Sequence, residues 1–505
     1  MPDTPGVPAG ADALRAADAG LRAANEALRV LLADKDAVIA RLLGQIAELE
    51  GRVARLELLV SRNSGNSSMP PSTDDLPGKK PPAGKPRRGP GGGKRRPGKQ
   101  PGAPGAHLAW SDHPDDRVSH FPRGTCGCGA DLSAARDLGV AYSHQVVDLP
   151  PVTAQTIQHD RYEVECGCGR RHVAGAPPEA AGVPWTVTYG LDLQAWCVFL
   201  MVMHHIPVQR CADLVESLCG TRPSDGWVHG LLARAAAAAA GPNKVIRALV
   251  IAARVICGDE TPLRAGPGPK WRKKCLQVAC TSLLTCYFLG DRGLASFRGF
   301  IYDDLHGTVV VHDRYQNYDT FTGISHQLCC AHLLRDLEAA AQAYPRAAWP
   351  GKAAAALRAL IHAANQARDQ GLDRVPAAMT SRALRQFRHS ITAGLDQVPR
   401  LHGSKRKQPP ARLLLECLHD READVLRFLT DTAIPPTSNQ AERDLRPSKT
   451  QQKISGRLRS LQATRDRYAI RGYASTARKH GINALTAIRD ALAGTPWIPP
   501  DPAPA

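Results

Sequence analysis

The sequence predicts a multidomain protein of mixed α+β/α/β class, with an N-terminal coiled coil, a small cysteine-containing module and a mixed-sheet core that carries an all-helical insertion. Three observations predict this organisation: seven-residue apolar stripes near the N-terminus, two close pairs of cysteines, and buried strands that end in acidic residues. At 505 residues the chain is long enough for about two to four domains.

The net charge indicates the kind of partner. A formal charge of +18 favours a polyanion, with acidic membrane surfaces as the competing partner. No run of about 18 apolar residues and no signal-peptide pattern is found, so we expect a soluble cytoplasmic protein that does not bind a membrane. The fourteen cysteines are scattered through a long chain, which predicts core thiols or metal ligands rather than disulfides.

Residues 11–60 are predicted to form a coiled coil. Two stripes repeat every seven residues, with β-branched residues prominent in one and leucine in the other, as in parallel two-stranded coils. The stripes are Asn25, Leu32, Ile39, Ile46, Val53, Val60 and Leu14, Leu21, Leu28, Lys35, Leu42, Leu49, Leu56. We therefore expect a homo-oligomer, the alternative being an amphipathic helix that packs on its own chain.

Residues 61–106 are predicted to be a flexible basic linker. Nine cations lie between Lys79 and Lys99, separated by Gly and Pro, and no apolar periodicity is present. Such a segment is either a solubilising spacer or a non-specific contact for phosphates, which would make binding depend on salt.

Residues 107–175 are predicted to be a zinc-binding module. Two Cys-Gly-Cys pairs, separated by a β-rich stretch, can supply four thiolates to a tetrahedral Zn²⁺. The predicted ligands are Cys126, Cys128, Cys166 and Cys168, with His120, His144, His159 and His172 as reserve ligands. A module this small would need the metal to hold it together.

Residues 184–245 are predicted to be helical. A helix over 208–218, a turn at Cys219-Gly220 and a second helix from Ser224 or Asp225 are compatible with a helix-turn-helix DNA reader. An ordinary helical hairpin has the same pattern, so both interpretations stay open.

Residues 247–475 are predicted to hold the core. Buried strands end in carboxylates at Asp259 and Asp313, and two further strands and a helix lie between them. Strand ends are where α/β folds present ligands and catalytic groups. Three strands, a helix and a fourth strand, with acids on the first and fourth, form the ribonuclease-H-like order. A fifth strand (324–331) leads into a helix that bears His332 and Arg335, an all-helical insertion covers 337–430, and residues 476–505 form a C-terminal helix and a Pro-rich tail.

A third acid, Glu442, lies in a strongly basic helical segment. The cations around it are Arg443, Arg446, Lys449, Lys453, Arg457 and Arg459. Two Mg²⁺ or Mn²⁺ ions can clamp the attacking and leaving oxygens of a phosphodiester, and such hard ions prefer carboxylate ligands. Asp259, Asp313 and Glu442 form such a ligand set if the strands are neighbours and the helix folds back. The cations then hold DNA phosphates.

The chain resembles the insertion sequence 66 family of transposases, of the DDE class with a ribonuclease-H-like catalytic domain. The resemblance rests on the coiled coil, the linker S-R-N-S-G-N-S-S-M-P-P-S, the double-cysteine module, D-E-T-P at 259–262, H-D-R-Y-Q-N-Y-D at 312–319, C-C-A-H-L-L-R-D-L at 329–337 and the Glu442 segment. It implies Asp259, Asp313 and Glu442 as the catalytic triad and the four cysteines as zinc ligands. The chain departs from the family in its C-x-C spacing and in Arg314, where many relatives have glycine.

The resemblance implies a nucleoid-associated bacterial transposase that binds terminal inverted repeats, cleaves DNA with a divalent metal and joins the freed ends to target DNA. His332 and Arg335 are expected to contact phosphate or to stabilise their helix, and accessory proteins of the same element are possible partners. The alternatives are a zinc-containing DNA-binding regulator or inactive domesticated transposase, a metal-dependent nuclease without strand transfer, and a structural scaffold for nucleic acid.

Overall fold

The computed structural model describes residues 9–60, 108–149, 152–175, 187–268, 274–401 and 407–500. It divides into two compact units. One comprises Met1–Ala83, Trp185–Val208 and Gly226–Ala505, and the other comprises Gly84–Pro184 and Gln209–Asp225. The predicted basic linker and the last five residues lie outside the described residues.

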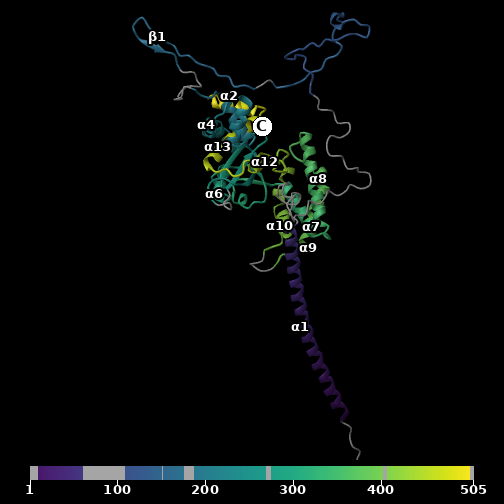
Figure 1. The fold of residues 1–505 in the computed structure, drawn as a ribbon. Coiled ribbons are helices and arrows are strands. Elements are labelled where there is room, and N and C mark those ends of the chain that lie inside the picture. Colours follow the sequence, from purple (N-terminus) through teal and green to yellow (C-terminus); the bar gives the residue numbers. More distant parts are fainter. Residues whose placement is uncertain are drawn as a thin grey trace, which may run out of the picture. The chain divides into compact units, whose positions relative to one another are not determined.

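The N-terminal segment is one continuous helix, α1 (Ala9–Val60), drawn in purple in Figure 1. Its apolar side chains are solvent-exposed in this single chain, among them Leu21, Leu28, Leu32, Ile39, Leu42, Leu49 and Val53. Some of these residues belong to one predicted stripe and the rest belong to the other. The helix therefore agrees with the sequence, whereas pairing with a second chain stays a prediction.

The core of the first unit is a five-stranded mixed sheet of order β5-β4-β3-β6-β7. Its strands are β3 (Val255–Leu263), β4 (Lys274–Cys280), β5 (Thr285–Gly290), β6 (Val309–His312) and β7 (Ser325–Leu328). The first three strands are antiparallel neighbours, and β6 and β7 run parallel to β3. The helix predicted between Asp259 and Asp313 is short: α6 (Leu294–Arg298) ends at Gly299, and only a 3-10 turn (Tyr302–Asp304) follows.

Both faces of the sheet are covered, which explains why most residues of β4 and β6 are buried and apolar. Alternate residues of β6 enter different cores: Val310 packs with Ile246 and Tyr473, whereas Val311 packs with Leu333 and Leu445. Helices α5 (Ala240–Ala252), α13 (Leu461–Lys479) and α14 (Ala484–Leu492) contribute to the first core, and α7 (Cys330–Ala343) and α12 (Asn439–Ile454) contribute to the second.

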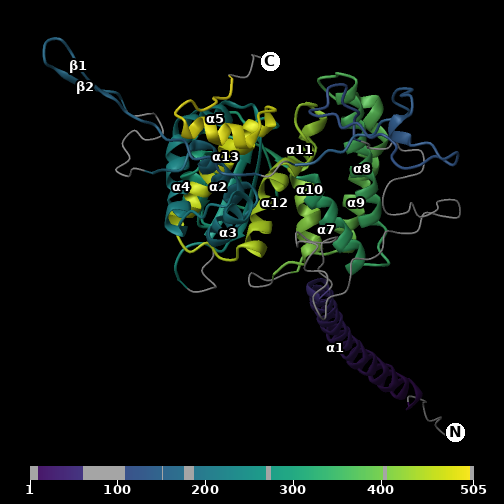
Figure 2. The ribbon, with the colours of Figure 1, turned by 45° about the horizontal axis from the view of Figure 1, so that its top comes forward.

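The stretch predicted as a helical insertion contains α8 (Trp349–Asp369), α9 (Ala377–Gln397), α10 (Pro410–Asp420) and α11 (Glu422–Val425), with no strand among its described residues. Figures 1 and 2 show α8 and α9 side by side. Ala353, Leu357, Leu360 and Phe387 are buried along these two helices. The insertion thus has an apolar interior that is continuous with one core of the sheet.

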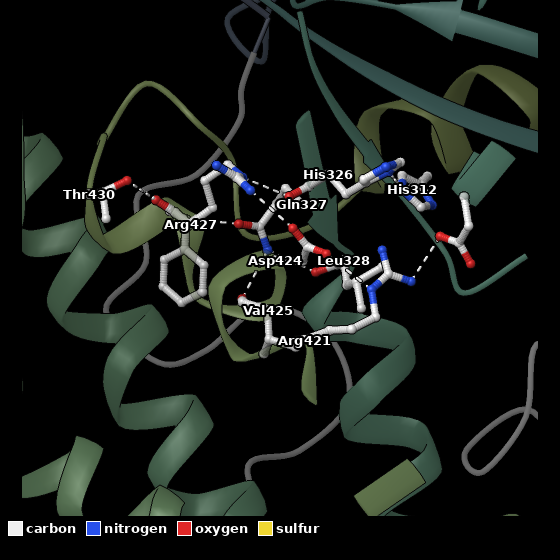
Figure 3. Close-up of polar contacts among 11 residues, drawn as sticks. His312, His326, Gln327, Leu328, Arg421, Asp424, Val425, Arg427 and Thr430 are labelled. Atoms are coloured by element: carbon white, nitrogen blue, oxygen red, sulfur yellow. Dashed lines mark hydrogen bonds and ion pairs between the residues drawn. The ribbon is translucent and has the colours of Figure 1, made fainter. Parts of the chain in front are cut away.

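Polar contacts tie the end of this insertion to β7 (Figure 3). The amide of Gln327 donates to the Val425 carbonyl at 3.0 Å and accepts from the Phe428 N–H at 2.9 Å. Arg427 donates to the His326 carbonyl at 2.7 Å. Because Gln327 and Phe428 are buried, these bonds satisfy groups that have no access to water and fix where the insertion returns to the sheet.

The remaining helices of the first unit are α2 (Leu191–Met203) and α4 (Asp225–Ala238). Arg471 of α13 is buried and donates to the Val202 carbonyl at 2.8 Å, and the buried Arg467 donates to the Met201 carbonyl. These guanidinium groups satisfy carbonyls at the end of α2 that lack partners within the helix.

The second unit contains a short antiparallel pair, β1 (Glu163–Glu165) and β2 (Arg171–Val173), a 3-10 turn (Leu132–Ala134) and most of α3 (Val208–Cys219). Helices α3 and α4 have nearly the bounds that were predicted for the two helices of a helix-turn-helix. They fall in different units, so DNA reading by this pair stays a prediction.

Among the described residues, no single helix has the length and apolarity to cross a membrane. Helices α4 and α5 pass that test only as a pair bent by 52°.

Candidate active site

The register of the sheet gives Asp259, on β3, and Asp313, just after β6, matching positions on adjacent strands. The last parallel pair between β3 and β6 joins Cys257 to Val311, and each aspartate lies two residues farther along its strand. The prediction that the first strand ends at Asp259 is wrong, because pairing with β4 continues β3 to Leu263, whereas Asp313 directly follows β6. The parallel register nevertheless gives the two carboxylates matching positions on adjacent strands. Burial, with the charge of Asp313 added, raises the pKa of Asp259 to about 6.

Backbone groups orient one oxygen of each aspartate. The Glu260 N–H donates to Asp259 Oδ1 at 2.8 Å, and the Tyr315 N–H donates to Asp313 Oδ1 at 2.8 Å. Neither Oδ2 has a hydrogen bond within the described part of the chain. Each carboxylate therefore keeps an oxygen for a ligand.

Glu442 lies in the first turn of α12 and contacts cations of α7. Its Oε1 is 3.4 Å from both Nη1 and Nη2 of Arg335 and 3.7 Å from Nε2 of His332. All three side chains are partly exposed, at 24% for Glu442, 28% for Arg335 and 18% for His332. The site is consequently open to a ligand from solution.

His332 relates Glu442 to the two aspartates. Charge interactions couple it to both Asp313 and Asp259, while its ring lies against Glu442. Burial opposes its protonation, but hydrogen bonding to Cys329 and the charges of Cys329 and Asp313 raise the pKa of His332 to about 9. The described residues nevertheless contain no group of three or more His, Cys, Asp or Glu side chains placed to hold one metal ion. The two aspartates are neighbours, and Glu442 is paired with Arg335 and His332.

Glu442 is placed by its neighbour Asp444, which is almost fully buried. Asp444 accepts from Lys479 Nζ at 2.8 Å and from Thr285 Oγ1 at 3.0 Å, and its carbonyl accepts from the Tyr287 hydroxyl at 2.6 Å. Two of these partners lie on β5 and one on α13. These bonds fix α12, and with it Glu442, against the sheet.

The sequence profile described as Transposase IS66 family matches residues 186–466, which is more than half of the chain and includes all three acids. The protein belongs to this transposase family. A second profile, of a family of unknown function (DUF6444), matches residues 9–109 and so covers α1 and the linker. Comparison with curated proteins gives no match.

In this IS66-family transposase, sequence reasoning gave no role to Cys329, although it lies in the recognised C-C-A-H segment. The pair His312–Leu328 is the last of the β6–β7 register, so Asp313 and Cys329 follow at adjacent positions. The Ser438 N–H donates to Cys329 Sγ at 3.3 Å, and the Cys330 N–H donates to the Pro436 carbonyl at 2.9 Å. Although burial raises it, the pKa of Cys329 is lowered overall by hydrogen bonds from His332 and Ser438. The start of α7 therefore holds the start of α12.

We expect Cys329→Ala to destabilise the protein by about 1–3 kcal/mol, because the buried Ser438 N–H loses its acceptor. Cys329→Ser retains an acceptor atom and is expected to lose less. Urea unfolding of the two purified variants measures the difference. Equal destabilisation by serine and alanine would contradict a role for the hydrogen bond.

Two further residues near the aspartates were missed. Glu260 is 4% exposed, accepts from the Tyr318 hydroxyl at 3.3 Å and lies 3.6 Å from Arg292 Nη2. Burial, with the charges of Asp313 and Asp259, raises its pKa to about 8. Arg292 is 61% exposed and stacks over the Tyr315 ring at 4.4 Å. Arg292 comes from the loop after β5, which the pattern of apolar runs does not relate to the acids.

The predicted DNA-binding cations divide into two groups. Arg443, Arg446, Lys449 and Lys453 are exposed and make no ion pair within 4.0 Å among the described residues. Lys449 also interacts electrostatically with Asp259. Arg457, in contrast, donates through Nε and Nη2 to the Gly266 carbonyl, at 2.9 and 2.5 Å, and Arg459 is exposed beyond the helix. The guanidinium of Arg457 therefore holds a loop in this structure.

The predicted zinc ligands form two turns of the same geometry. In each turn the N–H of the first cysteine donates to the carbonyl of the residue four positions later, Ala130 or Arg170. The carbonyl of the same cysteine accepts from the N–H of Gly129 or Gly169, and all four distances are 2.8 Å. Both glycines have positive φ, at 89° and 80°. All four cysteines are exposed and free, and the described residues do not gather the two turns into one site.

Proposed function

We propose that this IS66-family transposase binds the terminal inverted repeats of its element, cleaves the DNA strand and joins the freed end to target DNA. The observation that carries the proposal is the β3–β6 register, which gives Asp259 and Asp313 neighbouring positions, with Glu442 related to both through His332. The strand order β5-β4-β3-β6-β7 supports a ribonuclease-H-like core, since acids lie on the first and fourth strands in chain order.

Asp259, Asp313 and Glu442 are proposed to hold Mg²⁺ or Mn²⁺. The donor set fits a hard cation, because both aspartates keep an oxygen without a hydrogen bond. The raised pKa of Asp259 comes first from burial and then from the negative charge of Asp313, which a dication would offset. When bound, such an ion supplies Lewis-acid stabilisation of the phosphodiester oxygens. The chain's own part is to place the phosphate: Arg446, Lys449 and Lys453 lie on the same face of α12 as Glu442.

The other parts are assigned by the same reasoning. The exposed apolar stripes of α1 support a homo-oligomeric coiled coil, which would hold two DNA ends in one complex. The paired cysteine turns support a Zn²⁺ site, because backbone hydrogen bonds, from Cys128 to Cys126 and from Cys168 to Cys166, lower the pKa of the first thiol in each turn and so favour thiolates.

The test is to incubate the purified protein with terminal-repeat DNA, target plasmid and Mg²⁺ and to analyse the DNA for joined products. Joined products that depend on Mg²⁺ support the proposal. Binding without cleavage would favour a DNA-binding regulator, and cleavage without joining would favour a nuclease.

The cations of α12 are predicted to contribute to DNA affinity through phosphate contacts. Arg446→Ala and Lys449→Ala are each expected to weaken binding of all sequences alike and to lower the slope of log affinity against log salt by about one. Titrations at several salt concentrations measure this slope. Arg298→Ala, which removes an exposed cation of α6, is the control and should leave the slope unchanged.

A further inference from the structure

The contact between Arg335 and Glu442 has the geometry of a weak, exchangeable ion pair. Both terminal nitrogens of Arg335 point to one oxygen, Oε1, at 3.4 Å. A strong arginine–carboxylate pair instead forms two parallel bonds at about 2.7–2.9 Å. The chain contains such a closer pair, because Arg388 reaches both oxygens of Glu422 at 2.7–3.1 Å. Compared with that pair, Arg335 is held loosely by Glu442.

Arg335 is also placed where a DNA phosphate would arrive. Glu442, Arg446, Lys449 and Lys453 are spaced four, seven and eleven residues along α12 and share one face of the helix. The three cations are exposed and have no ion pair of their own among the described residues. A strand that binds along this face reaches Glu442 at its end, and Arg335, 28% exposed, is at that point.

Arg335 cannot bind Glu442 and a DNA phosphate tightly at the same time. The guanidinium fork matches a phosphate as well as a carboxylate. A terminal phosphate or a phosphodiester of the strand, held by the neighbouring cations, therefore competes with Glu442 for Arg335. While Arg335 stays on Glu442, its positive charge opposes a divalent cation at the same carboxylate. Removing Arg335 from Glu442 therefore favours metal binding by the acid.

We propose that Arg335 exchanges partners when DNA binds: in the free protein it neutralises Glu442, and in the complex it holds a phosphate and leaves Glu442 available to the divalent ion. Arg335 is thus a positioning residue that makes DNA binding and metal binding cooperative. The inference rests on the proposed function, since it assumes that Glu442 and the two aspartates bind the metal. By linkage, DNA then tightens metal binding by the same factor as metal tightens DNA binding.

The experiment measures Mn²⁺ affinity from the electron paramagnetic resonance signal of free Mn²⁺, with and without a short random-sequence duplex. In the wild-type protein the duplex is expected to tighten Mn²⁺ binding by about tenfold. In Arg335→Gln, Mn²⁺ without DNA should bind about as tightly as it does to the wild type with DNA, and the duplex should add little. Arg298→Gln, at an exposed cation on α6 without an ion pair among the described residues, is the matched control and should keep the coupling.

Coupling of equal size in Arg335→Gln and in the wild type would overturn the inference, as would wild-type Mn²⁺ affinity that does not depend on DNA. Arg335→Met, which keeps the length of the side chain without its charge, gives the same expected result and replaces the glutamine variant if that does not fold. Asp259→Asn separates failure of the proposed metal site from failure of the partner exchange of Arg335. If it leaves Mn²⁺ binding unchanged, the proposed metal site itself is wrong, whatever Arg335 does.

Discussion

Asp259→Asn is expected to reduce Mg²⁺-dependent cleavage of terminal DNA by about a thousandfold or more, because a ligand to a catalytic metal is worth several kcal/mol of transition-state stabilisation. Asparagine is nearly isosteric but carries no charge, so it binds a divalent ion poorly. DNA binding measured without a divalent ion should stay close to wild type, since the cations of α12 are untouched. A gel assay of cleavage, combined with a binding titration, separates the two effects.

Glu442→Gln is expected to give the same loss, because it removes the third carboxylate of the proposed set. Asp303→Asn is the matched control: it neutralises an exposed aspartate with no partner among the described residues and should leave cleavage unchanged. Cleavage retained by either purified triad variant would contradict the assignment of these acids.

Lys479→Met is expected to destabilise the protein by about 3–5 kcal/mol, which is the typical cost of removing one partner from a buried ion pair. The side chains of Lys479 and Asp444 are only 12% and 11% exposed, and their charged atoms are 2.8 Å apart. Lys479 also donates to the carbonyls of Thr281 and Leu284, so its loss leaves several buried acceptors without a donor. Urea unfolding measures the change in free energy.

The neighbouring Arg478 provides the control. It is exposed on the same turn of α13 and has no ion pair among the described residues, so Arg478→Met should change stability by less than about 0.5 kcal/mol. The double variant Lys479→Met with Asp444→Leu should recover part of the loss, because it leaves no unpaired buried charge. Similar stability of Lys479→Met and Arg478→Met would show that this ion pair does not hold α12 in place.

The strands and their acids could be predicted because their signal is local. A short apolar run followed by a carboxylate identifies Asp259 and Asp313 without knowledge of the partner strand, although β3 continues past Asp259 to Leu263 because it pairs with β4 there. Glu442 could be singled out in the same way, as one acid among cations. What the sequence could not give is which strand end faces which, since register depends on pairing between distant segments.

The contacts that the sequence could not show join residues that are far apart in the chain. Cys329 gains its role from Ser438, which is 109 residues away, and Arg335 meets Glu442 across 107 residues. Arg457 shows the opposite case. Its charge suggested a phosphate contact, but a carbonyl 191 residues away accepts its hydrogen bonds. Composition identifies the charge of such a residue, whereas only the fold determines its partner.

Asp259, Asp313 and Glu442 are proposed to hold one divalent-metal site when DNA is bound. Replacing Mg²⁺ by Fe²⁺ in the DNA complex and adding ascorbate and peroxide generates hydroxyl radicals at the metal, which cut the nearby backbone. Cuts are expected close to residues 259, 313 and 442, and they should disappear in Asp259→Asn. Cuts confined to other parts of the chain, or a pattern unchanged in Asp259→Asn, would contradict it.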